Sequence, residues 1–194
     1  MIPRDMTAVL RARARAFPVV ALTGPRQSGK TTLVRKTFPR LPYVSLEDPD
    51  VREVATHDPR GFLRRYEDGA IFDEVQRAPD LFSYLQGVVD ASRHLGRFIL
   101  TGSHHFLLME RIGQSLAGRV AVLHLPPLAQ NELARRGLLP STPEEAVFRG
   151  GYPPLFDRKV SPIDWFPSYV QTYLERDVRL VRAVPDLRTF HRFV

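Results

Sequence analysis

The chain has 194 residues, of which 43% are apolar and 25% are charged, as expected for a globular protein of one domain or of one domain and the start of another. It lacks cysteine and any apolar run long enough to cross a bilayer, which excludes disulfides, thiolate metal sites and membrane-spanning helices, and it begins without a signal-peptide pattern, so we expect a cytoplasmic protein without membrane contact. The net charge of +7 is local, because the first 40 residues hold nine basic residues and one acidic residue.

Apolar runs alternate with amphipathic segments along residues 6–125. The predicted strands cover 17–23, 42–46, 70–72, 97–101 and 120–125, and the predicted helices cover 6–16, 30–38, 50–66 with a break at Asp58-Pro59, 80–92 and 106–116. The run over 17–23 is almost entirely apolar, which is typical of a strand buried on both faces. This alternation predicts an α/β fold with a parallel sheet and helices on both faces.

The pattern changes after Leu125. Two prolines at 126 and 127 end the sheet, and helices are predicted over 130–136 and 165–184, with a turn cluster over 150–154 between them. We therefore expect a core over 1–128 and a helical extension over 129–194. The extension has no obvious finishing signal at Val194, so we expect it to be the start of a C-terminal domain that is truncated here.

One motif has a clear chemical meaning. Residues 24–31 match G-x-x-x-x-G-K-[ST], and they lie between a predicted buried strand and a predicted helix. Glycine lets the backbone approach a phosphate closely, and backbone N–H groups at the helix N-terminus bind the negative charge. Lys30 is expected to reach the β- and γ-phosphates, and Thr31 to ligate Mg²⁺. The predicted nucleotide-binding residues are Gly24, Pro25, Arg26, Gln27, Ser28, Gly29, Lys30, Thr31 and Thr32.

Two acidic residues follow the predicted strand over 70–72. Asp73 is predicted to hold Mg²⁺ together with Thr31, and Glu74 to act as the general base that polarises an attacking water. The alternative is an ordinary capping pair at the start of the next helix. A small-molecule kinase would not need the second acid, so the pair favours water as the nucleophile.

Two further residues are candidates for contact with the γ-phosphate. Ser103 follows the predicted strand over 97–101 and is expected to orient the water or to sense the phosphate; the alternative is a simple turn. Arg119 precedes the last strand and is a candidate to stabilise transition-state charge in a neighbouring subunit, which implies a homo-oligomer. The alternative is a surface arginine paired with an acid, and Arg111 is the second candidate. The adjacent His104 and His105 do not have metal-ligand spacing.

These segments together resemble one prokaryotic ATPase family, with a core of the AAA domain 14 type that is usually followed by a C-terminal domain of unknown function. The resemblance covers nearly the whole chain and rests on residues 17–33, 43–53, 70–90, 98–120, 123–133, 150–155 and 169–178. It implies a P-loop NTPase fold, an AAA-like three-layer α/β/α core with five parallel strands in the order 5-1-4-3-2, and ATP binding with slow hydrolysis. His104 departs from the family pattern, which leaves Ser103 as the sensor candidate.

We therefore predict a Mg²⁺-dependent ATPase that couples ATP binding and hydrolysis to a conformational or assembly change. ATP is preferred to GTP because the chain lacks an Asn-Lys-x-Asp motif. The alternative is a nucleotide-gated DNA-binding or regulatory module with little turnover. That alternative rests on a basic N-terminal face, which includes Arg4, Arg11, Arg13 and Arg15.

Overall fold

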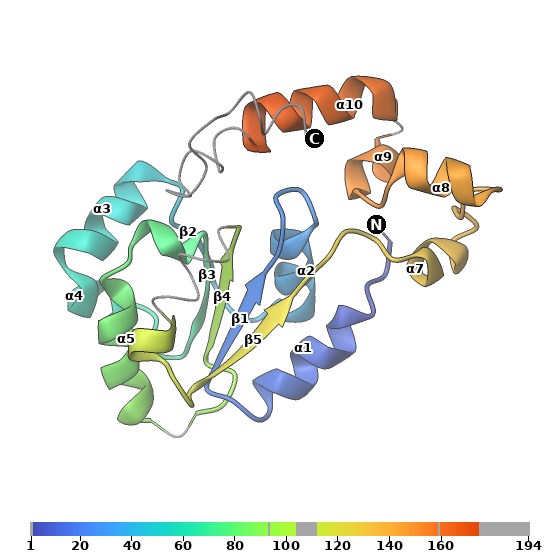
Figure 1. The fold of residues 1–194 in the computed structure, drawn as a ribbon. Helices are drawn as coiled ribbons and strands as arrows, with labels where there is room; N and C mark the ends of the chain where they lie inside the picture. The colour runs from blue at the N-terminus through green and yellow to red at the C-terminus, as the bar shows by residue number, and fades with distance from the viewer. Residues whose placement is uncertain (1, 93, 104–111, 159, 175–194) are drawn as a thin grey trace. The chain divides into compact units, whose positions relative to one another are not determined.

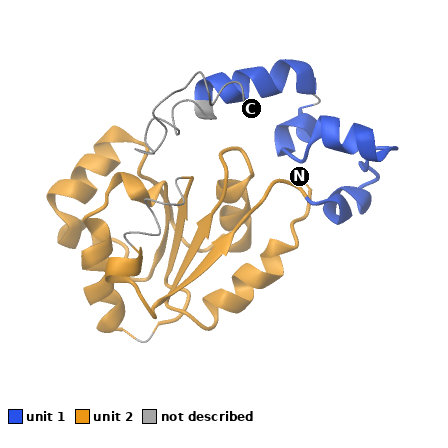
Figure 2. Ribbon diagram, in the orientation of Figure 1, with its two compact units in different colours: residues 1, 129–194 blue, residues 2–128 orange. Residues whose placement is uncertain are grey.

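The computed structural model describes residues 2–92, 94–103, 112–158 and 160–174, which form parts of two compact units (Figure 1, Figure 2). The first unit covers residues 2–128, and the second begins at Ala129. The elements of the first unit are α1 (Met6–Ala14), β1 (Val19–Thr23), α2 (Lys30–Thr37), β2 (Tyr43–Ser45), α3 (Pro49–His57), α4 (Pro59–Arg64), β3 (Ala70–Asp73), the 3₁₀ helix η1 (Val75–Arg77), α5 (Leu81–Asp90), β4 (Phe98–Gly102) and β5 (Val120–His124).

The five strands of this unit form one sheet in which all neighbours are parallel. Their order is β2-β3-β4-β1-β5, which is the predicted order read from the other edge. The register aligns the ends of the strands: Thr23 pairs with Gly102 on one side and with His124 on the other. Because parallel strands bring their carboxyl ends to one edge, the loops that follow β1, β3 and β4 meet there. The predicted fold class is confirmed.

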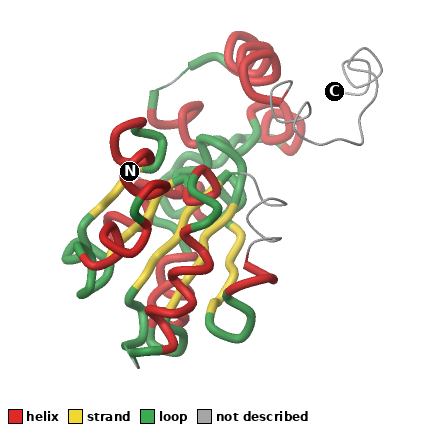
Figure 3. The backbone as a smooth tube through the Cα atoms, turned by 90° about the vertical axis from the view of Figure 1, so that its left-hand side faces the viewer, coloured by secondary structure: helices red, strands yellow, loops and turns green. Residues whose placement is uncertain are grey.

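Each central strand sends alternate side chains to the two faces of the sheet. In β1, Val19 and Ala21 pack with residues of α3, α4 and α5, whereas Val20 and Leu22 pack with residues of α1 and α2. All five residues of β1 are buried. The sheet therefore lies between two helical layers (Figure 1, Figure 3).

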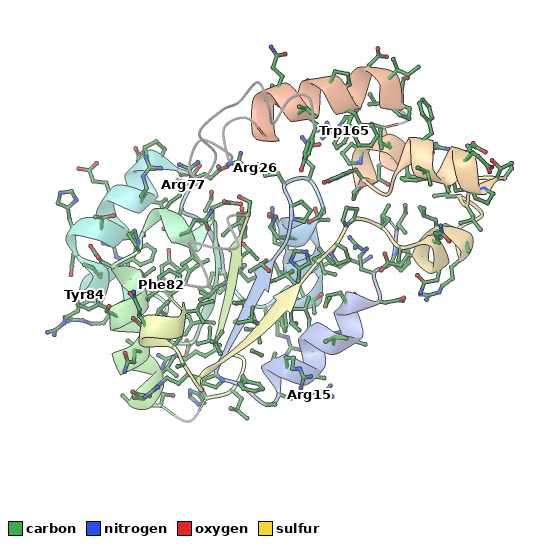
Figure 4. The ribbon with its side chains drawn as sticks, in the orientation of Figure 1. Arg15, Arg26, Arg77, Phe82, Tyr84 and Trp165 are labelled. Atoms are coloured by element: carbon green, nitrogen blue, oxygen red, sulfur yellow. The ribbon has the colours of Figure 1, made fainter. Side chains whose placement is uncertain are left out.

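The second unit is helical over its described residues. It contains α7 (Gln130–Ala134), α8 (Pro143–Arg149), α9 (Pro153–Asp157), α10 (Pro162–Tyr169) and a π-helical turn (Val170–Leu174). Four aromatic side chains pack together here, with Trp165 stacked on Tyr169 at a centroid distance of 4.6 Å (Figure 4). The other two are Tyr152 and Phe166.

Several element boundaries differ from the expectation. The sequence pattern does not predict α8. The predicted turn at 150–154 is partly helical because α9 begins at Pro153, where the fixed φ of proline suits the first turn of a helix. The helix expected from residue 165 begins earlier, at Pro162, for the same reason. Residues 106–111 and 175–184 of two predicted helices lie outside the described residues, while 112–115 are helical. Among the described residues, no helix has the length and apolar character that a membrane span requires.

Candidate functional site

The loop over 24–29 connects the carboxyl end of β1 to the first residue of α2, and two of its glycines are required by geometry. Gly24 has a φ of 145°, and a Cβ atom there would lie 2.3 Å from the backbone oxygen of Leu125. Gly29 caps α2 in the left-handed region, with a φ of 93°. Only glycine adopts both arrangements without strain, so the sequence G-x-x-x-x-G sets this loop conformation.

Lys30 directly follows the loop in sequence, and its buried ammonium binds backbone oxygens of that loop. Its exposed fraction is 5%. Its ammonium donates hydrogen bonds to the backbone oxygens of Gly24 at 2.8 Å and Pro25 at 2.9 Å. Burial lowers the pKa of Lys30 below its ordinary value, and the charges of Glu74 and Asp73 oppose that shift. The positive charge is therefore held at the point where the loop, α2 and the two acids meet.

Asp73 is the centre of a buried hydrogen-bond network at the end of β3. Its Oδ2 accepts hydrogen bonds from the Thr31 hydroxyl at 2.9 Å and from the Tyr43 hydroxyl at 2.7 Å. Its Oδ1 accepts a hydrogen bond from the hydroxyl of Thr101, which is fully buried. The network forms because β3 lies between β2 and β4, with Ser45 beside Asp73 and Leu100 beside Phe72. The two residues predicted to ligate Mg²⁺, Thr31 and Asp73, are thus in direct contact.

Glu74 is held in an unusual backbone conformation. Its φ of 54° and ψ of 43° lie in the left-handed region, which a residue other than glycine, asparagine or aspartate rarely adopts. Its Oε2 accepts hydrogen bonds from the Ser103 hydroxyl at 3.0 Å and from the Gln76 amide at 2.5 Å. Although Glu74 precedes η1, its side chain makes no capping bond, so the capping alternative does not account for its position.

Two members of this network, Tyr43 and Thr101, are not among the predicted site residues. Burial raises the pKa of the Tyr43 phenol above its ordinary value, and the hydrogen bond to Asp73 adds to that shift. Thr101 could have been found, because it ends the strand predicted over 97–101 and carries a hydroxyl. Tyr43 gives no comparable signal, because its hydroxyl reaches Asp73 along the length of the ring from an edge strand.

Arg26 and Arg77 lie at the carboxyl edge of the sheet with Glu47 between them (Figure 4). The guanidinium of Arg77 is 3.1 Å from the Glu47 carboxylate, and that of Arg26 is 4.0 Å from the same oxygen. Other predicted nucleotide-binding residues differ in exposure. Ser28 in the loop is fully buried, whereas Gln27 in the loop and Thr32 in α2 are exposed. Within the described residues, the Ser28 hydroxyl has no hydrogen-bond partner.

Arg119 lies at the amino end of the parallel strands, opposite the end that carries the phosphate loop. It directly precedes β5, and its backbone oxygen accepts a hydrogen bond from Val19 at the start of β1. Its guanidinium binds both carboxylate oxygens of Asp90, one of them at 2.9 Å, and lowers the pKa of that carboxyl group. Arg119 therefore lies at the other end of β1 from the phosphate loop of its own chain, and a role in a neighbouring chain stays a prediction. Arg111, His104 and His105 lie outside the described residues.

The basic N-terminal face is smaller than expected. Arg11, Arg13 and Arg15 are exposed on α1 and its C-terminal end, but Arg4 is buried, with an exposed fraction of 8%. The inclusion of Arg4 in that face is therefore wrong: its guanidinium is directed at three backbone oxygens inside the unit. The periodicity of a helix says nothing about residues ahead of it, which is why the sequence did not separate Arg4 from the others.

The donor set suits a nucleotide with Mg²⁺. Thr31 and Asp73 offer a hydroxyl and a carboxylate oxygen, the ligand types that Mg²⁺ takes from proteins alongside water and phosphate. Over the part of the chain that the structure describes, no group of three or more His, Asp or Glu side chains could hold a metal ion by itself.

Comparison with known proteins gives a family and a fold. A family profile described as an AAA domain matches residues 16–134, and a domain of unknown function, DUF8612, matches residues 141–194. Two curated relatives, the uncharacterized proteins Rv2008c of Mycobacterium tuberculosis and Mb2031c of Mycobacterium bovis, are each 36% identical over 180 residues. That alignment covers 90% of this chain but 39% of each relative, so the chain spans well under half of their length. The resemblance expected from the sequence is confirmed.

Two solved structures have the same fold at low sequence identity. The Walker-type ATPase PABY2304 of Pyrococcus abyssi has a TM-score of 0.55 and 18% identity, over 93% of this chain and 72% of that one. AMPPCP-bound DnaA from Aquifex aeolicus has a TM-score of 0.56 and 16% identity, over 96% of this chain and 71% of that one. At these identities the likeness establishes the fold alone.

Proposed function

The chain belongs to the AAA domain family whose profile matches residues 16–134, and we propose that it binds ATP with Mg²⁺ in the loop over 24–31 and hydrolyses it in the cytoplasm. The observation that carries the proposal is the 2.9 Å hydrogen bond from Thr31 to Asp73, together with the buried Lys30 that precedes Thr31, whose charge interacts with that of Asp73. Three groups of the right chemistry, from two distant segments of the sequence, lie next to a loop with the backbone of a phosphate-binding site.

Each residue has a separate task in this reaction. The loop amides and Lys30 bind the β- and γ-phosphates, and Thr31 and Asp73 hold the cation, which supplies charge neutralisation on the phosphate oxygens when it is bound. Glu74 orients a water molecule and accepts its proton as the water oxygen bonds to the γ-phosphorus and the bond to the leaving ADP oxygen breaks. Ser103, 3.0 Å from Glu74, positions that carboxylate and senses the phosphate.

We assign Arg119 to the site of a neighbouring copy, which makes turnover depend on assembly and couples hydrolysis to a conformational or assembly change. The support for this assignment is the position of Arg119 at the amino end of the strands, away from the phosphate loop of the same chain. The rate of ATP hydrolysis per chain should rise with protein concentration in the parent protein and stay flat in Arg119→Ala. A parent rate that is high and independent of concentration would remove this assignment.

Nucleotide binding itself is tested by removing the buried cation. Lys30→Ala should weaken binding of a fluorescent ATP analogue by at least about 100-fold, because a charge-assisted phosphate contact is lost. Lys36→Ala is the matched control, since Lys36 is exposed on the same helix. Equal affinities of the parent and Lys30→Ala would contradict the proposal.

A second candidate is a nucleotide-gated DNA-binding module with little turnover. The exposed Arg11, Arg13 and Arg15 favour it, and Arg15 lies at the end of the sheet away from Arg26 (Figure 4). Phosphate contacts of this kind give an affinity for double-stranded DNA that falls steeply between low and moderate salt. Absence of binding at low salt would remove this candidate.

A further inference from the structure

Arg4 is a buried charged residue that the proposed reaction does not use. It precedes α1, and its guanidinium donates to the backbone oxygen of Ser28 at 2.8 Å, inside the phosphate loop. The same side chain donates to the backbone oxygens of Pro126 at 2.7 Å and Pro127 at 3.2 Å. We call residues 125–128 the exit segment, because they follow β5 and lead into α7. One guanidinium thus connects the phosphate loop to the exit segment.

The exit segment and the phosphate loop are also in direct contact on a second side. The backbone N–H of Leu125 donates to the oxygen of Thr23 at 2.8 Å, just before the loop begins. Gly24 lies so close to Leu125 that any Cβ atom would collide with its backbone oxygen. The loop is therefore held against the exit segment at its first residue by backbone packing and at Ser28 by Arg4.

The sequence explains why an arginine is needed. β5 ends at His124, and Leu125 is followed by Pro126 and Pro127, which have no N–H. The segment therefore leaves the sheet ladder after Leu125, and its carbonyl oxygens need other donors. A planar guanidinium carries several donors in a fixed fork and reaches oxygens on two segments at once. A lysine ammonium has donors at a single point and cannot span both segments in the same way.

We propose that Arg4 is a positioning residue that transmits the nucleotide state of the phosphate loop to the exit segment. The proposal rests on the proposed nucleotide binding. Ser28 immediately precedes the cap of α2, so a change in the loop on phosphate binding moves the Ser28 carbonyl, and Arg4 carries that change to Pro126 and Pro127. The exit segment is the covalent route from the core to the residues that begin at Ala129.

Hydrogen exchange of the full chain, with and without Mg²⁺ and ATP, tests this transmission. In the parent protein, nucleotide should slow exchange in peptides covering 24–35 and in peptides covering 125–134. In Arg4→Met the first response should persist and the second should be lost, with an affinity for ATP about tenfold weaker, since one set of charged hydrogen bonds is removed. The matched control is Arg11→Met, which removes the same charge from an exposed position nearby.

The outcomes separate this inference from the proposed function. If nucleotide leaves 24–35 unprotected in the parent, the proposed nucleotide binding fails. If 24–35 is protected and 125–134 responds equally in the parent and Arg4→Met, the role of Arg4 is overturned. Arg4→Lys keeps the charge and most of the volume, so it decides the matter if Arg4→Met does not fold: loss of the 125–134 response supports the fork, and a full response overturns it.

Discussion

The sheet has a carboxyl edge and an amino edge, at the two ends of its parallel strands. Each has a hydrogen-bonded carboxylate near it, one buried and one exposed to solvent. At the carboxyl edge, Asp73 is nearly covered and its carboxylate is shared by three hydroxyl groups from α2, β2 and β4. At the amino edge, Asp90 meets Arg119 with both side chains in contact with water, at exposed fractions of 46% and 34%. Each carboxylate is well bonded, but only one of them is removed from solvent.

A hydrogen bond to a carboxylate is costly to lose where the carboxylate is buried. A buried carboxylate oxygen that loses its donor cannot turn to water, whereas an exposed one can. The carboxyl edge should therefore respond strongly to single changes that keep volume constant, and the amino edge weakly. Three substitutions test this contrast through the stability of the protein. A fourth, Glu74→Gln, comes first because it tests the catalytic role of the carboxyl edge.

Glu74→Gln should give the largest effect, and it acts on turnover. ATP hydrolysis should fall by about 10²–10⁴-fold, because an amide cannot accept the proton of the attacking water. Binding of a fluorescent ATP analogue should stay close to that of the parent. Glu53→Gln, at an exposed position on α3, is the control, and hydrolysis at the parental rate in Glu74→Gln would show that Glu74 is not the general base.

Thr101→Val removes the donor to Asp73 Oδ1 at nearly constant volume. The free energy of unfolding in urea should fall by about 1–3 kcal/mol, because a buried carboxylate oxygen is left without this partner. Thr56→Val, an exposed change on α3, should leave the free energy of unfolding almost unchanged. Equal stability of the two variants would mean that the carboxyl edge is no more sensitive than the surface.

Tyr43→Phe removes another donor to Asp73, at a position that is only half-buried. The free energy of unfolding should fall by about 0.5–1.5 kcal/mol near pH 8. The pKa of Tyr43 is raised above its ordinary value of 10.0 in the folded protein, so the phenol favours folding below that pH and this advantage is lost as the pH rises beyond it. Urea titrations at several pH values should show the parent and variant converging above pH 10. A difference that grows with pH would have the wrong sign.

Arg119→Ala should have the smallest effect on stability. Water screens the exposed pair with Asp90, so the midpoint of thermal unfolding should stay within about 2 °C of the parent. Asp90→Ala should give the same small shift. A much larger shift in either variant would remove the contrast between the edges, because an exposed ion pair would then matter as much as the buried network.

The sequence predicted the parts of this protein that depend on local pattern. Apolar runs predicted the positions of all five strands. The signal has a clear physical reason in β1, β3 and β4, because a strand buried on both faces needs apolar side chains throughout. Residues 24–31 predicted the phosphate loop, because Gly24 and Gly29 are required by backbone geometry that only glycine meets without strain. The acids Asp73 and Glu74 were found because they directly follow an apolar run.

The side chains that contact those residues depend on how the elements pack in three dimensions. Tyr43 and Thr101 reach Asp73 because β2 and β4 lie on either side of β3, and strand neighbours are set by the packing of the whole sheet. The burial of Arg4 depends on oxygens more than 100 residues away in sequence, at Pro126 and Pro127. Periodicity reports the surroundings of a residue along its own element, whereas a hydrogen-bond partner from another element is fixed only when the elements pack.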